Sequence, residues 1–135
     1  MKKTGSQVET DVYHLVKSSV IGTSITGQVY RDGTRPHESR LEDCVVIFIT
    51  ALDGTNQNGV VSINTYVKDK VFGERFLKDT KRCSEIESYC QQFFESLPTN
   101  EYLFSLAQLI HTFEEPEINQ HFVNIKLEFK YNTLN

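Results

Sequence analysis

The run Cys44-Val45-Val46-Ile47-Phe48-Ile49 determines the fold class that the sequence predicts. Six consecutive apolar residues indicate a strand with apolar side chains on both faces, which requires cover above and below. Residues 60–68 form a second predicted strand, in which apolar side chains alternate with polar ones. The segment 53–59 between them is rich in Gly, Asn and Asp, so the two strands are predicted to form a β-hairpin.

Amphipathic helices are predicted on both sides of this hairpin. Residues 6–19 carry an apolar stripe, and Ser6 and Glu9 have the spacing of a capping box. Residues 84–97 repeat the pattern with Ser84 and Glu87, and Pro98 ends the helix because proline cannot continue it.

Three further segments complete the predicted sheet. Residues 25–30 suit a short strand, 103–113 a strand or a short helix, and 123–131 an alternating strand. Residues 31–43 are predicted to be a surface loop, 69–82 a solvated polar segment and 114–117 a turn. The prediction is one α+β domain over residues 1–135. Its mixed, largely antiparallel sheet has about five strands with two helices on one face, in the order α-β-β-β-α-β-β.

Covering the apolar strand at residues 44–49 raises a difficulty. Two helices shield one face of a sheet, and we expect Cys44, Val46 and Phe48 to point away from them. Leaving such side chains in water forfeits about 1.5 to 3 kcal/mol each relative to burial. We therefore predict that another subunit covers this face and that the protein is an oligomer. The alternative is that the long loops fold back over it.

Composition excludes several classes of function. The 135 residues carry a formal net charge of −4, which argues against a sequence-specific nucleic-acid binder. The longest apolar run is far shorter than the roughly 20 residues that cross a bilayer, so no membrane partner is expected. The first residues are basic but lead into Val8-Glu9-Thr10-Asp11, so no secretory signal is predicted. Three cysteines, an odd and sparse set, favour reduced thiols inside a cell.

No combination of residues points to catalysis, a metal or a cofactor. The histidines lack metal-ligand spacing, although His111 and His121 lie on neighbouring predicted strands and could meet as a packing contact. Among the cysteines, Cys90 is predicted to be a buried structural thiol. Cys83 alone begins a predicted helix, where a thiol pKa can fall, but no histidine is placed to serve it. The prediction is that the protein is not an enzyme and has no catalytic, metal or cofactor residues.

The order of short motifs resembles a known family. An amphipathic helix leads to Gly27-Gln28-Val29-Tyr30, a charged loop, an apolar strand, a hairpin loop and a strand ending Tyr66-Val67-Lys68-Asp69. A helix, the stretch Leu106-Ala107-Gln108-Leu109-Ile110, an acidic turn and a strand ending Phe129-Lys130-Tyr131 follow. In order, spacing and size, nearly the whole chain resembles the tail-terminator, or tail-completion, proteins of long-tailed bacteriophages, including the lambda type.

The resemblance implies a structural role in virion assembly. Such proteins have a sheet flanked by helices and form a hexameric ring that caps the tail tube, stops its polymerisation and provides the head-joining surface. It implies as partners the chain itself, the major tail-tube protein and head–tail connector proteins, first in the host cytoplasm and then in the virion tail. The loops 31–43 and 53–59 are the expected contact elements. The predicted subunit or partner contacts are Arg31, Arg35, Val46, Phe48, Asp53, Asn56 and Asn58.

The alternative function is a small intracellular module that binds a peptide or small ligand on its sheet edge.

Overall fold

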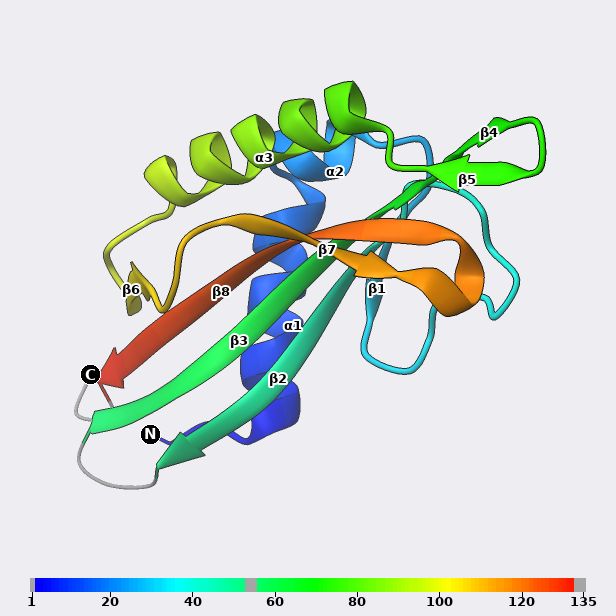
Figure 1. Cartoon of the computed structure of the whole chain (residues 1–135). Helices are drawn as coiled ribbons and strands as arrows, with labels where there is room; N and C mark the ends of the chain where they lie inside the picture. The colour runs from blue at the N-terminus through cyan, green and yellow to red at the C-terminus, as the bar shows by residue number, and fades with distance from the viewer. Residues whose placement is uncertain (1, 53–55, 133–135) are drawn as a thin grey trace.

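The computed structural model describes residues 2–52 and 56–132 of the chain. Within these ranges, three helices pack on one face of a mixed six-stranded sheet, and a separate two-stranded hairpin projects from one end (Figure 1). The predicted α+β class and the largely antiparallel pairing are confirmed, since, among the strands that the structure describes, only the first pairs in parallel. Among the described residues, no helix is long and apolar enough to span a bilayer.

The strands follow the order β1-β2-β3-β8-β6, and β7 pairs with β8 beside β6. They are β1 (Val29–Arg31), β2 (Cys44–Leu52), β3 (Asn56–Lys68), β6 (Tyr102–Leu106), β7 (His111–Glu115) and β8 (Gln120–Asn132). The projecting hairpin pairs β4 (Lys70–Phe72) with β5 (Arg75–Leu77). The helices are α1 (Gly5–Lys17), α2 (Val20–Ser24) and α3 (Thr80–Glu95), with a 3₁₀ turn at Pro116–Ile118.

The centre of the sheet is the antiparallel pair of β3 and β8. Their register runs unbroken from Asn56 opposite Asn132 to Lys68 opposite Gln120. Because side chains alternate between faces along a strand, one set of side chains from each strand meets the helices. The buried residues of this set include Val61, Ile63, Thr65, Val67, Val123, Ile125, Leu127, Phe129 and Tyr131, as the alternation predicted.

The predicted orientation of β2 is wrong. Cys44 and Val46 are fully buried on the face that the helices cover, and Phe48 packs against the same core. The side chains on the other face are Val45 and Ile47, and β2 then bulges before Thr50. A run that is apolar on both faces carries no phase information, so its composition could not determine which residues meet the helices.

Both helix starts differ from the prediction. The N-cap of α1 is Thr4, whose side chain accepts a hydrogen bond from the Gln7 backbone N–H while Gln7 binds the Thr4 N–H in return. The N-cap of α3 is Asp79, whose carboxylate accepts from the Arg82 N–H at 3.1 Å. The Ser6–Glu9 and Ser84–Glu87 spacings therefore lie inside the helices.

Several boundaries also change. Of the predicted strand 25–30, only Val29 and Tyr30 are in β1, and residues 20–24, which follow the predicted helix 6–19, form the short helix α2. The ambiguous stretch 103–113 lies within two strands, β6 and β7, with an irregular connection between them. The segment 69–82, predicted to be only a polar face, contains the β4–β5 hairpin and the start of α3.

Candidate interaction surface

The β4–β5 hairpin, residues 70–77, is an exposed arm. Its two strands are joined by a two-residue turn, Gly73 and Glu74. Gly73 has φ 64°, a positive value that tight hairpin turns require at their first central residue and that glycine adopts readily. Val71 is 68% exposed and Phe72 71% exposed. Phe76, opposite Val71 in the register, is also exposed. An isolated two-stranded hairpin is marginally stable in water, so apolar side chains left uncovered on it point to a partner.

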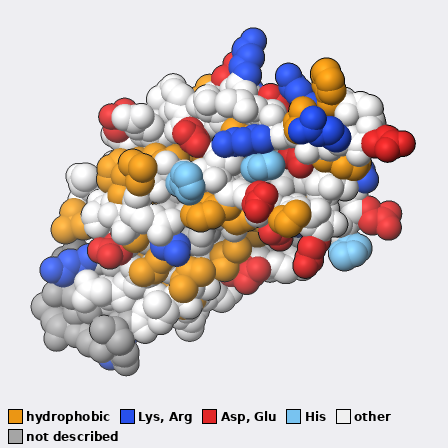
Figure 2. Space-filling model, in the orientation of Figure 1, with side chains coloured by type: hydrophobic (Ala, Val, Ile, Leu, Met, Phe, Trp, Pro, Cys, Tyr) orange, Lys and Arg blue, Asp and Glu red, His pale blue; other side chains and the backbone are white. Residues whose placement is uncertain are grey.

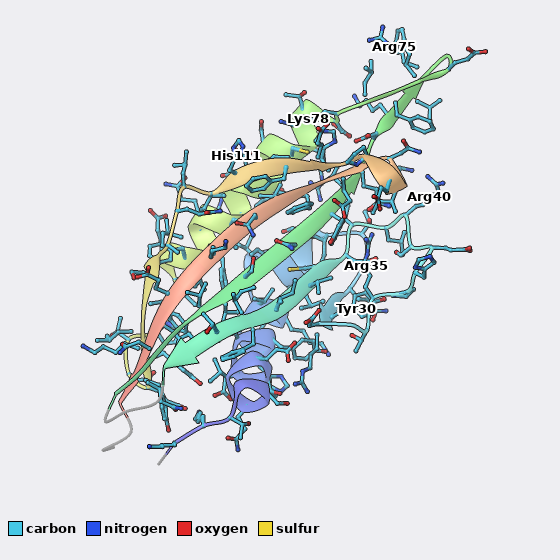
Figure 3. All side chains as sticks on the ribbon, turned by 60° about the horizontal axis from the view of Figure 1, so that its bottom comes forward. Tyr30, Arg35, Arg40, Arg75, Lys78 and His111 are labelled. Atoms are coloured by element: carbon cyan, nitrogen blue, oxygen red, sulfur yellow. The ribbon has the colours of Figure 1, made fainter. Side chains whose placement is uncertain are left out.

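The arm lies in a basic segment. Residues 68–82 contain six Lys and Arg residues and three acidic residues, a difference of +3. Figure 2 shows basic side chains gathered with apolar ones where the hairpin projects. In Figure 3, Arg75 lies along the arm, Lys78 near its base and Arg40 on the loop beside it. A groove of about 500 Å³ between arm and body is lined by Arg40, Lys68, Asp69, Lys70, Val71, Phe76 and Asp79.

A second exposed apolar group lies on β6 and the turn that follows it, and we call it the apolar edge. It consists of Leu103, Leu106 and Leu109, of which Leu109 is 81% exposed. In the described part of the chain, β6 pairs with β8 on one side and with no strand on the other. Unpaired backbone N–H and C=O groups along such an edge can bind another strand.

The glutamates of this part of the chain are spread over several elements, and lysines of β8 lie beside the apolar edge. From Cys83 to Ile125 the sequence contains seven Glu residues and neither Lys nor Arg. The acids are Glu85, Glu87 and Glu95 on α3, Glu101 before β6, Glu114 and Glu115 on β7, and Glu117 after it. Glu114 and Glu115 lie opposite the start of β8, near Lys68 at the base of the arm, whereas Lys130 lies opposite Leu103. Outside the basic segment, the chain carries a net charge of −7.

The sheet face away from the helices is open. At one end it forms a shallow trough of about 590 Å³, whose lining includes Thr50, Val60, Leu103, Glu128 and Lys130. Polar groups lie across the centre of this sheet face, where the Asn124 side-chain amide donates to Ser62 Oγ and Asn64 Oδ1, both at 2.7 Å. At the other end, the rings of Tyr66, Phe122, Phe113 and His111 form a row of neighbours.

Two predicted contact residues in the loop 31–43 hold the protomer together. Arg35 Nε donates to Asp43 Oδ2 at 2.9 Å, its Nη2 donates to Gln120 Oε1 at 3.0 Å, and its guanidinium lies 4.0 Å from the centre of the Tyr66 ring. Arg31 Nη2 binds Glu9 Oε2 at 3.2 Å and also Ser6. Both guanidinium groups therefore fix the loop to the sheet and to α1.

Asp43 explains the glycine in the Gly27-Gln28-Val29-Tyr30 motif. The carboxylate of Asp43 is fully buried and accepts from the Gln28 N–H at 3.2 Å, from Arg35 and from the Ser39 hydroxyl. A Cβ at Gly27 would lie 2.0 Å from Asp43 Oδ1, so any side chain there would displace the carboxylate. The motif thus allows close approach between the chain before β1 and the chain before β2.

The other predicted contacts are dispersed. Val46 is buried within the protomer and cannot be a subunit contact in this fold, and Phe48 is half-buried against Gly5 and Phe129. Asn58 is exposed and lines the trough. Asp53 lies outside the described residues, and Asn56 is placed only as a backbone position in β3. The sequence reasoning missed the arm, although two apolar pairs around Gly73-Glu74 were a usable hairpin signal.

The thiols are all buried in the core, and the two histidines predicted to meet lie on different faces of the sheet. Cys90 is buried, as predicted, and so are Cys44 and Cys83. Burial raises the pKa of the Cys83 thiol to about 11 and that of Cys44 to about 12, because the thiolate would be desolvated. His111 and His121 do not share a face: the register places His111 opposite Asn124, whereas His121 lies opposite Val67 and contacts Asp69 at 2.6 Å. In the described ranges, no three His, Cys, Asp or Glu residues gather as metal ligands would.

Comparison with known proteins adds no family to these observations. No protein-family model matches the chain, and no curated protein matches it significantly.

Proposed function

We propose that the chain is a structural assembly protein, a tail-terminator-like subunit that forms a ring on a phage tail tube. The ring would stop tube polymerisation and provide a surface for head-joining proteins. The observation that carries the proposal is the arm, because Val71, Phe72 and Phe76 project into solvent from a chain with a well-buried core. Full burial against a partner would recover about 1.5 to 3 kcal/mol for each such side chain.

The order of elements supports the same class. The resemblance drawn from the sequence rests on a helix, a short strand, a long hairpin, a second long helix and a final alternating strand, and the fold has these elements in that order. Val46 and Phe48 face the helices, so neither side chain leaves apolar surface on β2 that a second subunit must cover. Exposed apolar surface for assembly remains on the arm.

The proposed partners are further copies of the chain, the major tail-tube protein and head–tail connector proteins. The proposed location is the host cytoplasm and then the virion tail. No enzymatic step and no cofactor belong to this function.

Tube growth provides the test. The chain is co-expressed with the tube protein encoded in the same gene cluster, and the products are imaged by negative stain. We expect six-fold rings and tubes that carry a cap at one end. Tubes of the same length distribution with and without the chain would contradict the proposal, as would gene neighbours that are all metabolic or regulatory.

A peptide- or ligand-binding module is the second candidate, favoured by the trough over Val60 and Leu103. Under this reading the protein stays monomeric, and a peptide or fragment library perturbs the NMR signals of trough residues selectively. Perturbations scattered over the surface would count against it.

A further inference from the structure

We propose that the arm of one copy docks on the apolar edge of a second copy, so that copies associate head to tail. This inference deepens the proposed assembly function and depends on it. It assigns the two surfaces that meet: residues 70–77 on one subunit and Leu103, Leu106 and Leu109 on the next.

The apolar groups of the two surfaces match in kind. The arm exposes three large apolar side chains, and the apolar edge exposes three leucines at the margin of the sheet. Both surfaces also have strands with unpaired sides in the described part of the chain, since β4 and β5 pair only with each other. An arm strand laid along β6 would satisfy backbone hydrogen bonds while its side chains bury the leucines.

The charges argue for a second copy as the occupant. The arm belongs to a segment with an excess of +3, whereas the rest of the chain carries a net charge of −7, so the body of a second copy attracts the arm. One chain therefore carries both halves of a complementary pair. Opposite potentials on two surfaces speed encounter and fix orientation.

The placement of the two surfaces excludes contact within one molecule. Figure 1 shows the β4–β5 arm and β6 at opposite ends of the protomer. The contact is therefore heterologous: each copy offers one arm and one edge, and the chain of contacts either closes into a ring or continues as a filament. This geometry suits a ring-forming protein and differs from a two-fold dimer, in which one patch meets itself.

Sedimentation velocity on three double variants tests the inference. The arm variant is Phe72→Ser/Phe76→Ser and the edge variant is Leu103→Ser/Leu109→Ser. The matched control is Leu41→Ser/Ile49→Ser, at side chains that are about equally exposed elsewhere. All six positions are exposed, so unchanged circular dichroism and melting temperature should confirm folding. Wild type and control should form oligomers between about 1 and 100 μM, whereas arm and edge variants should each remain monomeric.

Mixing the two variants gives the sharper result. Only the arm of the edge variant and the edge of the arm variant are intact, so one contact can form and no further copy can add. We expect a 1:1 dimer that does not grow with concentration.

Rings whose stability is the same in all three variants would overturn the docking inference and leave the assembly function standing. Failure of tube capping, measured separately, would remove the function itself. A mixture of the two variants that stays monomeric, or wild type that stays monomeric up to about 500 μM, would also overturn the inference.

Discussion

At the scale of single residues, the buried ion pair of Arg35 and Asp43 organises the loop before β2. The Asp43 carboxylate is fully buried, and the Arg35 side chain is only 14% exposed. Removing one partner of such a pair leaves the other charge desolvated and unpaired, at a cost of about 3 to 5 kcal/mol. We expect Asp43→Ala to lower the free energy of unfolding by roughly 3 kcal/mol. Urea denaturation measures this loss.

The control for Asp43 lies in the same loop. Asp32 is exposed, so Asp32→Ala should change stability by less than about 0.5 kcal/mol. Equal effects of the two substitutions would show that the loop is not held by the Arg35–Asp43 contact.

The buried thiols predict how stability depends on alkaline pH. The pKa of Cys83 is raised to about 11 in the fold, whereas an unfolded thiol ionises near about 8.5. Between these values the unfolded chain loses a proton that the folded chain keeps, so stability falls as pH rises. The slope is up to about 1.4 kcal/mol per pH unit for each such thiol.

Denaturation of the wild type and of Cys83→Ala at pH 8, 9 and 10 measures this effect, and the variant should lose less stability over the range. At pH 8 a thiol reagent should label the native wild type only as fast as it unfolds. Rapid labelling of the native protein would contradict the buried placement of the cysteines.

At the scale of secondary-structure elements, the N-cap of α3 provides a matched pair of substitutions. Asp79→Ala removes the acceptor of the Arg82 N–H and should cost about 1 kcal/mol. Ser84→Ala, at the residue first predicted to cap this helix, should be neutral or slightly stabilising, because Ser84 is exposed inside the helix and Ala has the higher helix propensity. Chemical denaturation of both variants measures the difference. The reverse order would restore Ser84 as the helix start.

These helix starts illustrate what the sequence could predict and what it could not. Thr4 with Gln7 and Ser6 with Glu9 fit the same capping rule, so the pattern predicted a helix but left its first residue open. Alternating apolar residues and turn residues predicted the hairpin of residues 44–52 and 60–68. Nothing in the all-apolar strand indicated which of its side chains face the helices. Strands of three residues are too short to establish a period, so the apolar pairs on either side of Gly73-Glu74 were the signal that could have predicted the arm.

The arm itself should be dispensable for folding of the protomer. Its side chains are largely exposed, and Lys70 lies opposite Leu77 at its base, so a short turn can bridge these two residues. Replacing residues 71–76 by Asn-Gly should leave the melting temperature of the dilute protein within a few degrees. At high concentration the wild type should melt at a higher temperature than the deletion, since association stabilises the folded state. A collapse of the deleted protein at every concentration would show instead that the arm is part of the core.

At the scale of the whole molecule, the partition of charge predicts the sign of the salt effect on assembly. The net charge is −4, so copies without complementary surfaces repel one another, and added salt would strengthen their association by screening that repulsion. If the basic arm segment meets the body of another copy, which carries a net charge of −7, salt screens an attraction and weakens association instead. We expect the dissociation constant to rise several-fold between about 50 and 500 mM NaCl, with the apolar contact retaining part of the affinity.

A pair of single substitutions locates this electrostatic attraction. Arg75→Glu, on the arm, should weaken association and reduce or reverse its salt dependence. Lys17→Glu changes the net charge by the same amount from an exposed position at the end of α1, and should add only the general repulsion that salt removes. Sedimentation equilibrium at each salt concentration gives the dissociation constants. If both variants change the dissociation constant equally, total charge governs association and the arm has no special part in binding.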